Sequence, residues 1–152
     1  GIGFSLLLIV GLTFEKAPFG TGRGVLWGLA GFAVFTMAPN LGLPPELPTM
    51  PAADLTARQT WWLATILLSA AGLAITVFGK SPIIKILGLV LLALPHIWGA
   101  PHASGDSDVP PELAAQFAAS TIVLSALFWV MIGYFSSLIF VWLGEKNAKQ
   151  RK

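Results

Sequence analysis

Two histidines and four of the seven carboxylates in this sequence are candidates to bind a transition-metal ion together. His96 and His102 lie in the segment ALPHIWGAPH, where each of them follows a proline. A neutral imidazole suits Co²⁺, Ni²⁺ or Zn²⁺, and carboxylates from neighbouring loops can complete the coordination shell. The candidate metal ligands are His96, His102, Asp106, Asp108, Glu46 and Glu112. One interpretation of the sequence is therefore a metal-handling site.

A second interpretation gives the histidines a structural role only. Gly99 and Pro101 lie between them, so the two imidazoles do not have the spacing of ligands on one helix face. Two histidines also do not complete a coordination shell by themselves. In this interpretation His96 is a helix-terminal residue that is hydrogen-bonded to a loop carbonyl.

The composition places these residues in a membrane protein. Of 152 residues, 55% are hydrophobic and only 11% are charged, whereas a soluble domain has roughly 25% charged residues. Such a chain cannot cover its surface with polar groups, so its solvent must be lipid. The absence of cysteine excludes disulfides and thiolate metal sites. No phosphate loop, paired catalytic acids or nucleophile–base set is present, so we expect neither an enzyme nor a nucleic-acid-binding protein.

Hydropathy predicts an all-α membrane protein with five transmembrane helices in a single domain, residues 1–144, followed by a basic cytoplasmic tail, residues 145–152. The predicted spans are Gly1–Phe14, Val25–Leu43, Thr60–Phe78, Pro82–Trp98 and Leu113–Leu143. The first span would cover about 21 Å of a hydrocarbon core that is about 30 Å thick. We therefore expect that the intact protein has a sixth helix, which precedes Gly1.

The distribution of the cations predicts the orientation. Every lysine and arginine except Arg58 falls in the connections after the first and third spans, at the start of the fourth, or in the C-terminal tail. The positive-inside rule makes that side cytoplasmic. The C-terminus then lies in the cytoplasm and residue 1 points toward the outer side of a bacterial inner membrane. Both histidines face outward.

The second and fourth spans end alike, which suggests a parallel helical-hairpin repeat. Pro39-Asn40 corresponds to Pro95-His96, and the sequence PPEL follows at 44–47 and again at 110–113. Each PPEL glutamate either complements the positive start of a helix or lines an acidic outer vestibule. Asp54 and Asp108 are candidate helix caps.

Arg58 and the tryptophans after it open the third span. Arg58 either pairs with Glu46, Asp54 or Glu112, and so holds the two outer loops together, or snorkels to the interface. Trp61 and Trp62 fit an aromatic belt at the outer membrane surface.

Three segments together resemble the CbtA family: LGLPPELPTMPAADLTARQTWW (41–62), LALPHIWGAPH (92–102) and VPPELAAQFAAS (109–120). The resemblance implies a membrane subunit proposed to transport cobalt, here lacking its N-terminal part, with six helices when intact. It also implies a small one-helix companion, CbtB, with a histidine-rich end. Besides the candidate ligands His96, His102, Glu46 and Glu112, the positions that carry the resemblance are Pro44, Pro45, Arg58, Gln59, Trp61, Trp62, Pro95 and Pro101.

These observations lead to two functional hypotheses. The first is a subunit that imports Co²⁺, in which the outer carboxylates gather the ion and His96 and His102 meet it. The second is a non-transporting accessory subunit of a larger respiratory or photosynthetic membrane complex. The second is motivated by the absence of polar residues in the middle of the spans, because a transporter usually lines its path with such groups.

Overall fold

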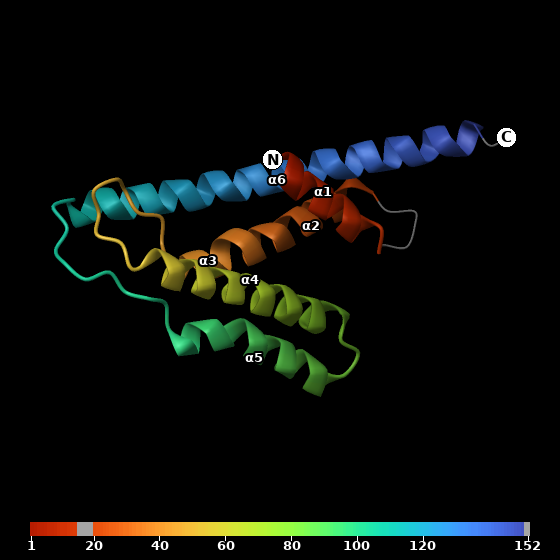
Figure 1. Cartoon of the computed structure of the whole chain (residues 1–152). Helices are drawn as coiled ribbons and strands as arrows, with labels where there is room; N and C mark the ends of the chain where they lie inside the picture. The colour runs from red at the N-terminus through yellow and green to blue at the C-terminus, as the bar shows by residue number, and fades with distance from the viewer. Residues whose placement is uncertain (15–19, 151–152) are drawn as a thin grey trace. The chain divides into compact units, whose positions relative to one another are not determined.

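The structure is a computed structural model that describes residues 1–14 and 20–150. Its helices are α1 (Ile2–Leu12), α2 (Thr21–Phe32), the π-helical segment η1 (Ala33–Met37), α3 (Ala38–Asn40), α4 (Leu55–Phe78), α5 (Pro82–Trp98) and α6 (Pro111–Gln150) (Figure 1). These described residues contain no strand, which confirms the all-α prediction. Four of the predicted spans differ from the helices at their ends, and α5 has the predicted bounds.

Two of the described helices are long and apolar enough to cross a membrane. They are α4 and the Pro111–Asn147 part of α6, whereas α1 and α5 are apolar but shorter. Five transmembrane helices therefore stay a prediction. Helix α6 continues to Gln150, so the first residues of the predicted tail extend the helix.

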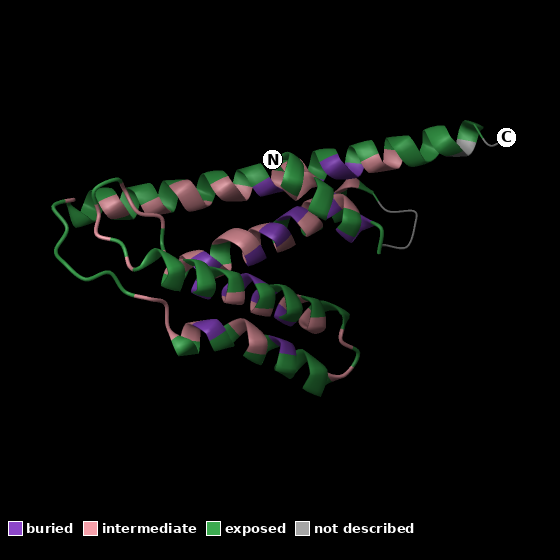
Figure 2. Cartoon of the chain, viewed as in Figure 1, coloured by how far each residue is buried: buried purple, intermediate pink, exposed green. Residues whose placement is uncertain are grey.

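The chain forms two compact units, and the prediction of a single domain stays untested. Unit 1 consists of Gly1–Phe32 and Leu124–Lys152, and unit 2 of Ala33–Val123. In both units the buried positions of the helices lie on the sides that face other helices (Figure 2).

Unit 1 is packed through glycines on α2 and α6. A Cβ on Gly28 would collide with the Trp129 carbonyl, and a Cβ on Gly133 would come within 2.9 Å of the Gly28 Cα. The Trp129 ring fills the space beside Gly31 and lies 4.7 Å from the Phe4 ring, between centroids. The helices therefore come into close contact at Gly28 and Gly31, since only glycine leaves room for it.

Unit 2 is built around an antiparallel hairpin of α4 and α5, which lie side by side (Figure 1). Asp54 caps α4 by accepting a hydrogen bond from Ala57 N at 2.9 Å, as predicted. Ser81 caps α5 through Ile84 N at 3.4 Å. Midway along the hairpin, a Cβ on Gly72 would come within 2.7 Å of the Gly88 carbonyl oxygen, so these glycines set the helix spacing.

The π-helical turn at Ala33–Met37 ends two residues before Pro39. A proline inside a helix has no N–H for the carbonyl four residues earlier, and its ring crowds that carbonyl. The wider π turn accommodates both effects, so the helical path continues to Asn40. The loop that leads to α4 follows directly.

The two PPEL segments have different structures, which removes one basis for the predicted repeat. Residues 44–47 lie in the loop before α4, whereas Pro111 begins α6 and Glu112 lies in its first turn. The helix-start interpretation is therefore confirmed for Glu112 and wrong for Glu46.

Candidate metal-handling site

Trp61 joins three segments of unit 2 at the N-terminal end of α4. Its indole Nε1 donates a hydrogen bond to the Pro95 carbonyl oxygen at 3.2 Å, and the bond is buried. Its ring meets the His96 ring edge-on, with centroids 6.0 Å apart. On another side the Trp61 ring packs against Gly42, where a Cβ would overlap it.

The prediction that both tryptophans belong to an interfacial belt is wrong for Trp61. Trp61 is only 7% exposed, whereas Trp62 is 42% exposed. Trp61 is buried because its N–H has an acceptor inside the protein, which offsets the cost of removing it from water. Trp62 has the exposure that a belt residue needs.

Helix α5 ends in a way that fixes His96. Gly99 N donates to the Pro95 carbonyl at 3.1 Å, and Gly99 has a φ of 91°, a conformation that favours glycine. The chain then turns back, so that a Cβ on Gly42 would lie 2.9 Å from the Ala100 Cβ. His96 is thus half-buried in the last turn of α5, beside Trp61.

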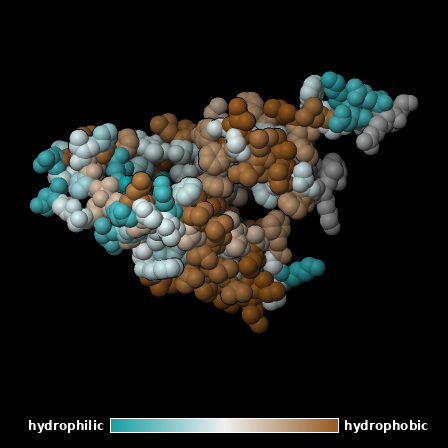
Figure 3. Space-filling model, in the orientation of Figure 1, coloured by the Kyte–Doolittle hydropathy of each residue, from teal (hydrophilic) through white to brown (hydrophobic). Residues whose placement is uncertain are grey.

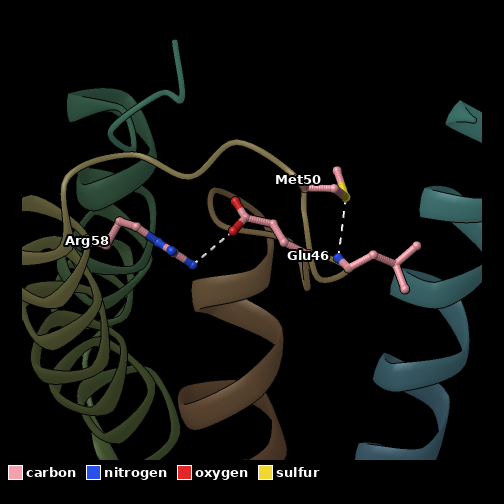
Figure 4. Close-up of polar contacts among 4 residues, drawn as sticks. Glu46, Met50 and Arg58 are labelled. Carbon is pink, nitrogen blue, oxygen red and sulfur yellow. Dashed lines mark hydrogen bonds and ion pairs between the residues drawn. The ribbon is translucent and has the colours of Figure 1, made fainter. Parts of the chain in front are cut away.

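Glu46 is held by an ion pair with Arg58. The Arg58 Nη2 and Glu46 Oε2 atoms are 3.1 Å apart, and both side chains are about a quarter to a third exposed (Figure 4). Of the three acidic partners predicted for Arg58, the structure selects Glu46. The pair links one loop to the start of α4, so the expectation that Arg58 joins the two predicted outer loops is wrong.

A tight turn immediately after Glu46 restricts the same loop. Met50 N donates to the Leu47 carbonyl at 3.2 Å, and Leu47 N donates to the Met50 sulfur at 3.3 Å (Figure 4). Thr49 has a φ of 76°, the left-handed conformation that position i+2 of a type II turn requires, and Pro48 precedes it. A β-branched residue is strained in this conformation. This Met50 contact was not predictable from the sequence, because methionine there fits apolar packing equally well.

The remaining candidate ligands are exposed and separate from these contacts. His102, Asp106 and Asp108 lie in the connection between α5 and α6, and Glu112 lies at the start of α6. Pro110 takes the N-cap position predicted for Asp108, since its carbonyl accepts Leu113 N at 3.0 Å. Within the ranges 1–14 and 20–150, no three His, Asp or Glu side chains are grouped so that they could hold a metal ion.

The other residues that carry the family resemblance differ in how far they are buried. Gln59 and Pro44 are exposed, Pro45 and Pro101 are half-buried, and Pro95 is buried. The structure thus brings together Glu46 with Arg58, and His96 with Trp61 and Pro95. Metal contact by any of the six candidate ligands stays a prediction.

Two buried hydroxyl residues on α4 were missed in the sequence. Thr65 and Ser69 follow Trp61 at four-residue intervals and are 0% and 1% exposed. The Thr65 hydroxyl donates to the Trp61 carbonyl at 2.8 Å, whereas Ser69 Oγ has no hydrogen-bond partner in the described structure. Trp61, Thr65 and Ser69 recur every four residues, and Gly72 follows three residues later. This spacing could have predicted their burial, because it places them on the face of α4 that packs against α5.

The fold and these contacts define an all-helical membrane protein with polar contacts gathered at one end of the α4–α5 hairpin. Residues 1–141 match the family described as "Probable cobalt transporter subunit (CbtA)". The chain therefore belongs to the CbtA family, which confirms the resemblance seen in the sequence. This is a family of transporter subunits, in agreement with the expectation that the chain is not an enzyme. No curated protein and no solved structure matches the chain.

Proposed function

We propose that this chain is the membrane subunit through which Co²⁺ enters a bacterial cell across the inner membrane. The observation that carries the proposal is the family match over residues 1–141. The accessory-subunit alternative has no comparable support. Its motivation is also weaker than the sequence suggested, since α4 contains the buried hydroxyls of Thr65 and Ser69.

The entry of Co²⁺ begins in this proposal at the exposed carboxylates of the α5–α6 connection and of the first turn of α6. Asp106, Asp108 and Glu112 raise the local concentration of cations. His96 then offers a borderline-soft nitrogen ligand at the end of α5. A metal ion at Glu46 competes with Arg58 for Oε2, because the ion pair occupies that oxygen.

The energy for uptake comes from the membrane potential or from a partner, since the sequence has no nucleotide-binding motif. An inside-negative potential of 100 mV favours the entry of a divalent cation by about 4.6 kcal/mol, which is a concentration ratio of about 10³. A small CbtB-like companion is the partner that the resemblance implies, and its histidine-rich end would deliver the metal.

Uptake of radioactive cobalt by cells that express the full protein, with and without the companion, tests this proposal. We expect accumulation above vector-only cells and a loss of about tenfold in His96→Ala, if the imidazole contributes a charge-assisted contact of ~1.4 kcal/mol. Ser107→Ala, in the exposed connection between α5 and α6, is the control and should leave uptake unchanged. No accumulation by the wild type would reject transport, and full uptake by both His96→Ala and His102→Ala would remove the histidines from the mechanism. Purification as a fixed component of a large complex would favour the accessory subunit.

A further inference from the structure

The C-terminal part of α6 changes from apolar to cationic along one helix face. Phe135, Ile139 and Trp142 are large and more than half exposed. Lys146 and Lys149 follow at four- and three-residue intervals, so they continue the same face. Figure 3 shows the hydrophobic surface giving way to a hydrophilic end near the C-terminus.

Lys146 lies over the ring of Trp142, with its Nζ atom 5.2 Å from the ring centroid. A lysine side chain on a helix leans toward the helix N-terminus. The ammonium group of Lys146 is therefore directed back along α6, toward the apolar part of the face. Tryptophan rings prefer the level of the lipid headgroups, and a cation–π contact leaves N–H donors of the ammonium group free.

The length of α6 requires that part of the helix lies outside the hydrocarbon core. The helix has 40 residues, which is about 60 Å, twice the roughly 30 Å of the hydrocarbon core. Both ends of α6 cannot lie inside the bilayer. The change from the exposed apolar residues to Lys146 marks where the helix leaves it.

We infer that Trp142, Lys146 and Lys149 form a binding site for the phosphate group of an anionic lipid. The exposed apolar side chains of the same face contact the acyl chains, Trp142 packs at the level of the headgroup, and the two ammonium groups donate to the phosphate. This continuous face favours a lipid over free phosphate, because a free anion has no use for its apolar part. The site is independent of cobalt transport and lies within unit 1.

Native mass spectrometry of the full chain in detergent, with phosphatidylglycerol or phosphatidylcholine added, measures the site directly. We expect the wild type to retain phosphatidylglycerol over phosphatidylcholine. A juxtamembrane lysine contributes about fivefold to binding of anionic lipid, so Lys146→Gln with Lys149→Gln should lower retention by about 25-fold. Trp142→Leu should weaken retention of both lipids, because it removes the ring that packs at the level of the headgroup.

The sharpest control exchanges two neighbours. Lys146→Asn with Asn147→Lys keeps composition and net charge but moves one cation off the Trp142 face. We expect this exchange to lose about fivefold in retention of phosphatidylglycerol. Wild-type retention by the exchanged chain would overturn the inference, since binding would then depend on charge alone.

Two further arms distinguish other sources of the effect. The variant Lys80→Gln with Lys85→Gln also removes two positive charges, near α5, and should still retain phosphatidylglycerol. A loss of retention equal to that of the Lys146→Gln, Lys149→Gln variant would also overturn the inference. Inorganic phosphate should not raise the thermal unfolding temperature of the wild type, whereas phosphatidylglycerol should. Equal stabilisation by both would assign the lysines to free phosphate. Circular dichroism of each variant verifies that the helices are formed.

Discussion

Both units of this protein bring two helices close together through glycines, but their buried tryptophans make different contacts. In unit 1, Gly28 and Gly133 let α2 and α6 approach closely, and in unit 2 Gly72 and Gly88 do the same for α4 and α5. The buried tryptophans of the two units have different partners. Trp129 packs its ring against Gly31 and Phe4, whereas Trp61 donates its N–H to the Pro95 carbonyl and meets His96.

The glycine contacts bring helices together, whereas the hydrogen bond from a tryptophan N–H also determines which residue lies beside the ring. Close helix approach through glycine is a general solution in membranes, where no hydrophobic driving force distinguishes a helix from lipid. A buried N–H must find an acceptor, so a polar tryptophan also fixes the partner that it bonds. Unit 2 therefore holds the end of α5, and with it His96, in one position. Three changes test this contrast, from the largest expected effect to the smallest.

Gly133→Ala should have the largest effect on stability. Its Cβ would meet backbone atoms of Gly24 and Gly28, which cannot rotate away. We expect a loss of about 3 kcal/mol in the free energy of unfolding, measured by denaturant titration in mixed micelles. Gly144→Ala, where nothing lies within 4 Å of the added Cβ, is the control and should stabilise the helix by less than about 1 kcal/mol. If both variants unfold alike, the close contact of α2 with α6 is wrong.

Trp61→Phe should have an intermediate effect and tests the polar role directly. The change keeps an aromatic ring but leaves the buried Pro95 carbonyl without its second donor, so we expect a loss of about 1–2 kcal/mol in unfolding free energy. Cobalt uptake should fall with it if His96 is a ligand, because the imidazole loses its orientation. Trp62→Phe, at an exposed position, should change stability by less than about 0.5 kcal/mol. Equal effects of the two variants would show that the ring, and not the N–H, matters at position 61.

Ser69→Ala should have the smallest effect and the opposite sign. The Ser69 hydroxyl is buried and has no described partner, so its removal should raise the free energy of unfolding by about 1 kcal/mol. In unit 1 the buried Ser137 hydroxyl donates to the Tyr134 carbonyl at 2.8 Å, and Ser137→Ala should not stabilise the protein. A loss of stability in Ser69→Ala would mean that the hydroxyl has a partner, such as a bound water.

Local signals in the sequence predicted much of the fold. Hydropathy predicted the bounds of α5, and the structure gives their local reason: the cap at Ser81, Pro82 in the first turn and Gly99 after the last residue all act within one helical turn. The cap at Asp54 was found for the same reason, although hydropathy alone placed the start of α4 too late. The Glu46 position was not predictable in this way, because PPEL fits both a helix start and an extended loop.

The site was predicted only as a set of residue types. Arg58 had three acidic candidates, and only the path of the loop before α4 selects Glu46. Thr65 and Ser69 were overlooked because hydroxyl residues are tolerated on any face of a membrane helix, and their burial depends on where α5 packs.

The sequence by itself determined that this chain is helical, belongs in lipid and carries the motifs of its family. Composition, helix caps and linear motifs are properties of single segments, so no knowledge of packing is needed to recognise them. The tertiary structure decided which of two adjacent tryptophans is buried. Trp61 and Trp62 have the same chemistry, but only Trp61 faces the Pro95 carbonyl, which belongs to another helix. The free energy of burying an N–H depends on that acceptor, and contacts between distant segments exist only in the folded chain.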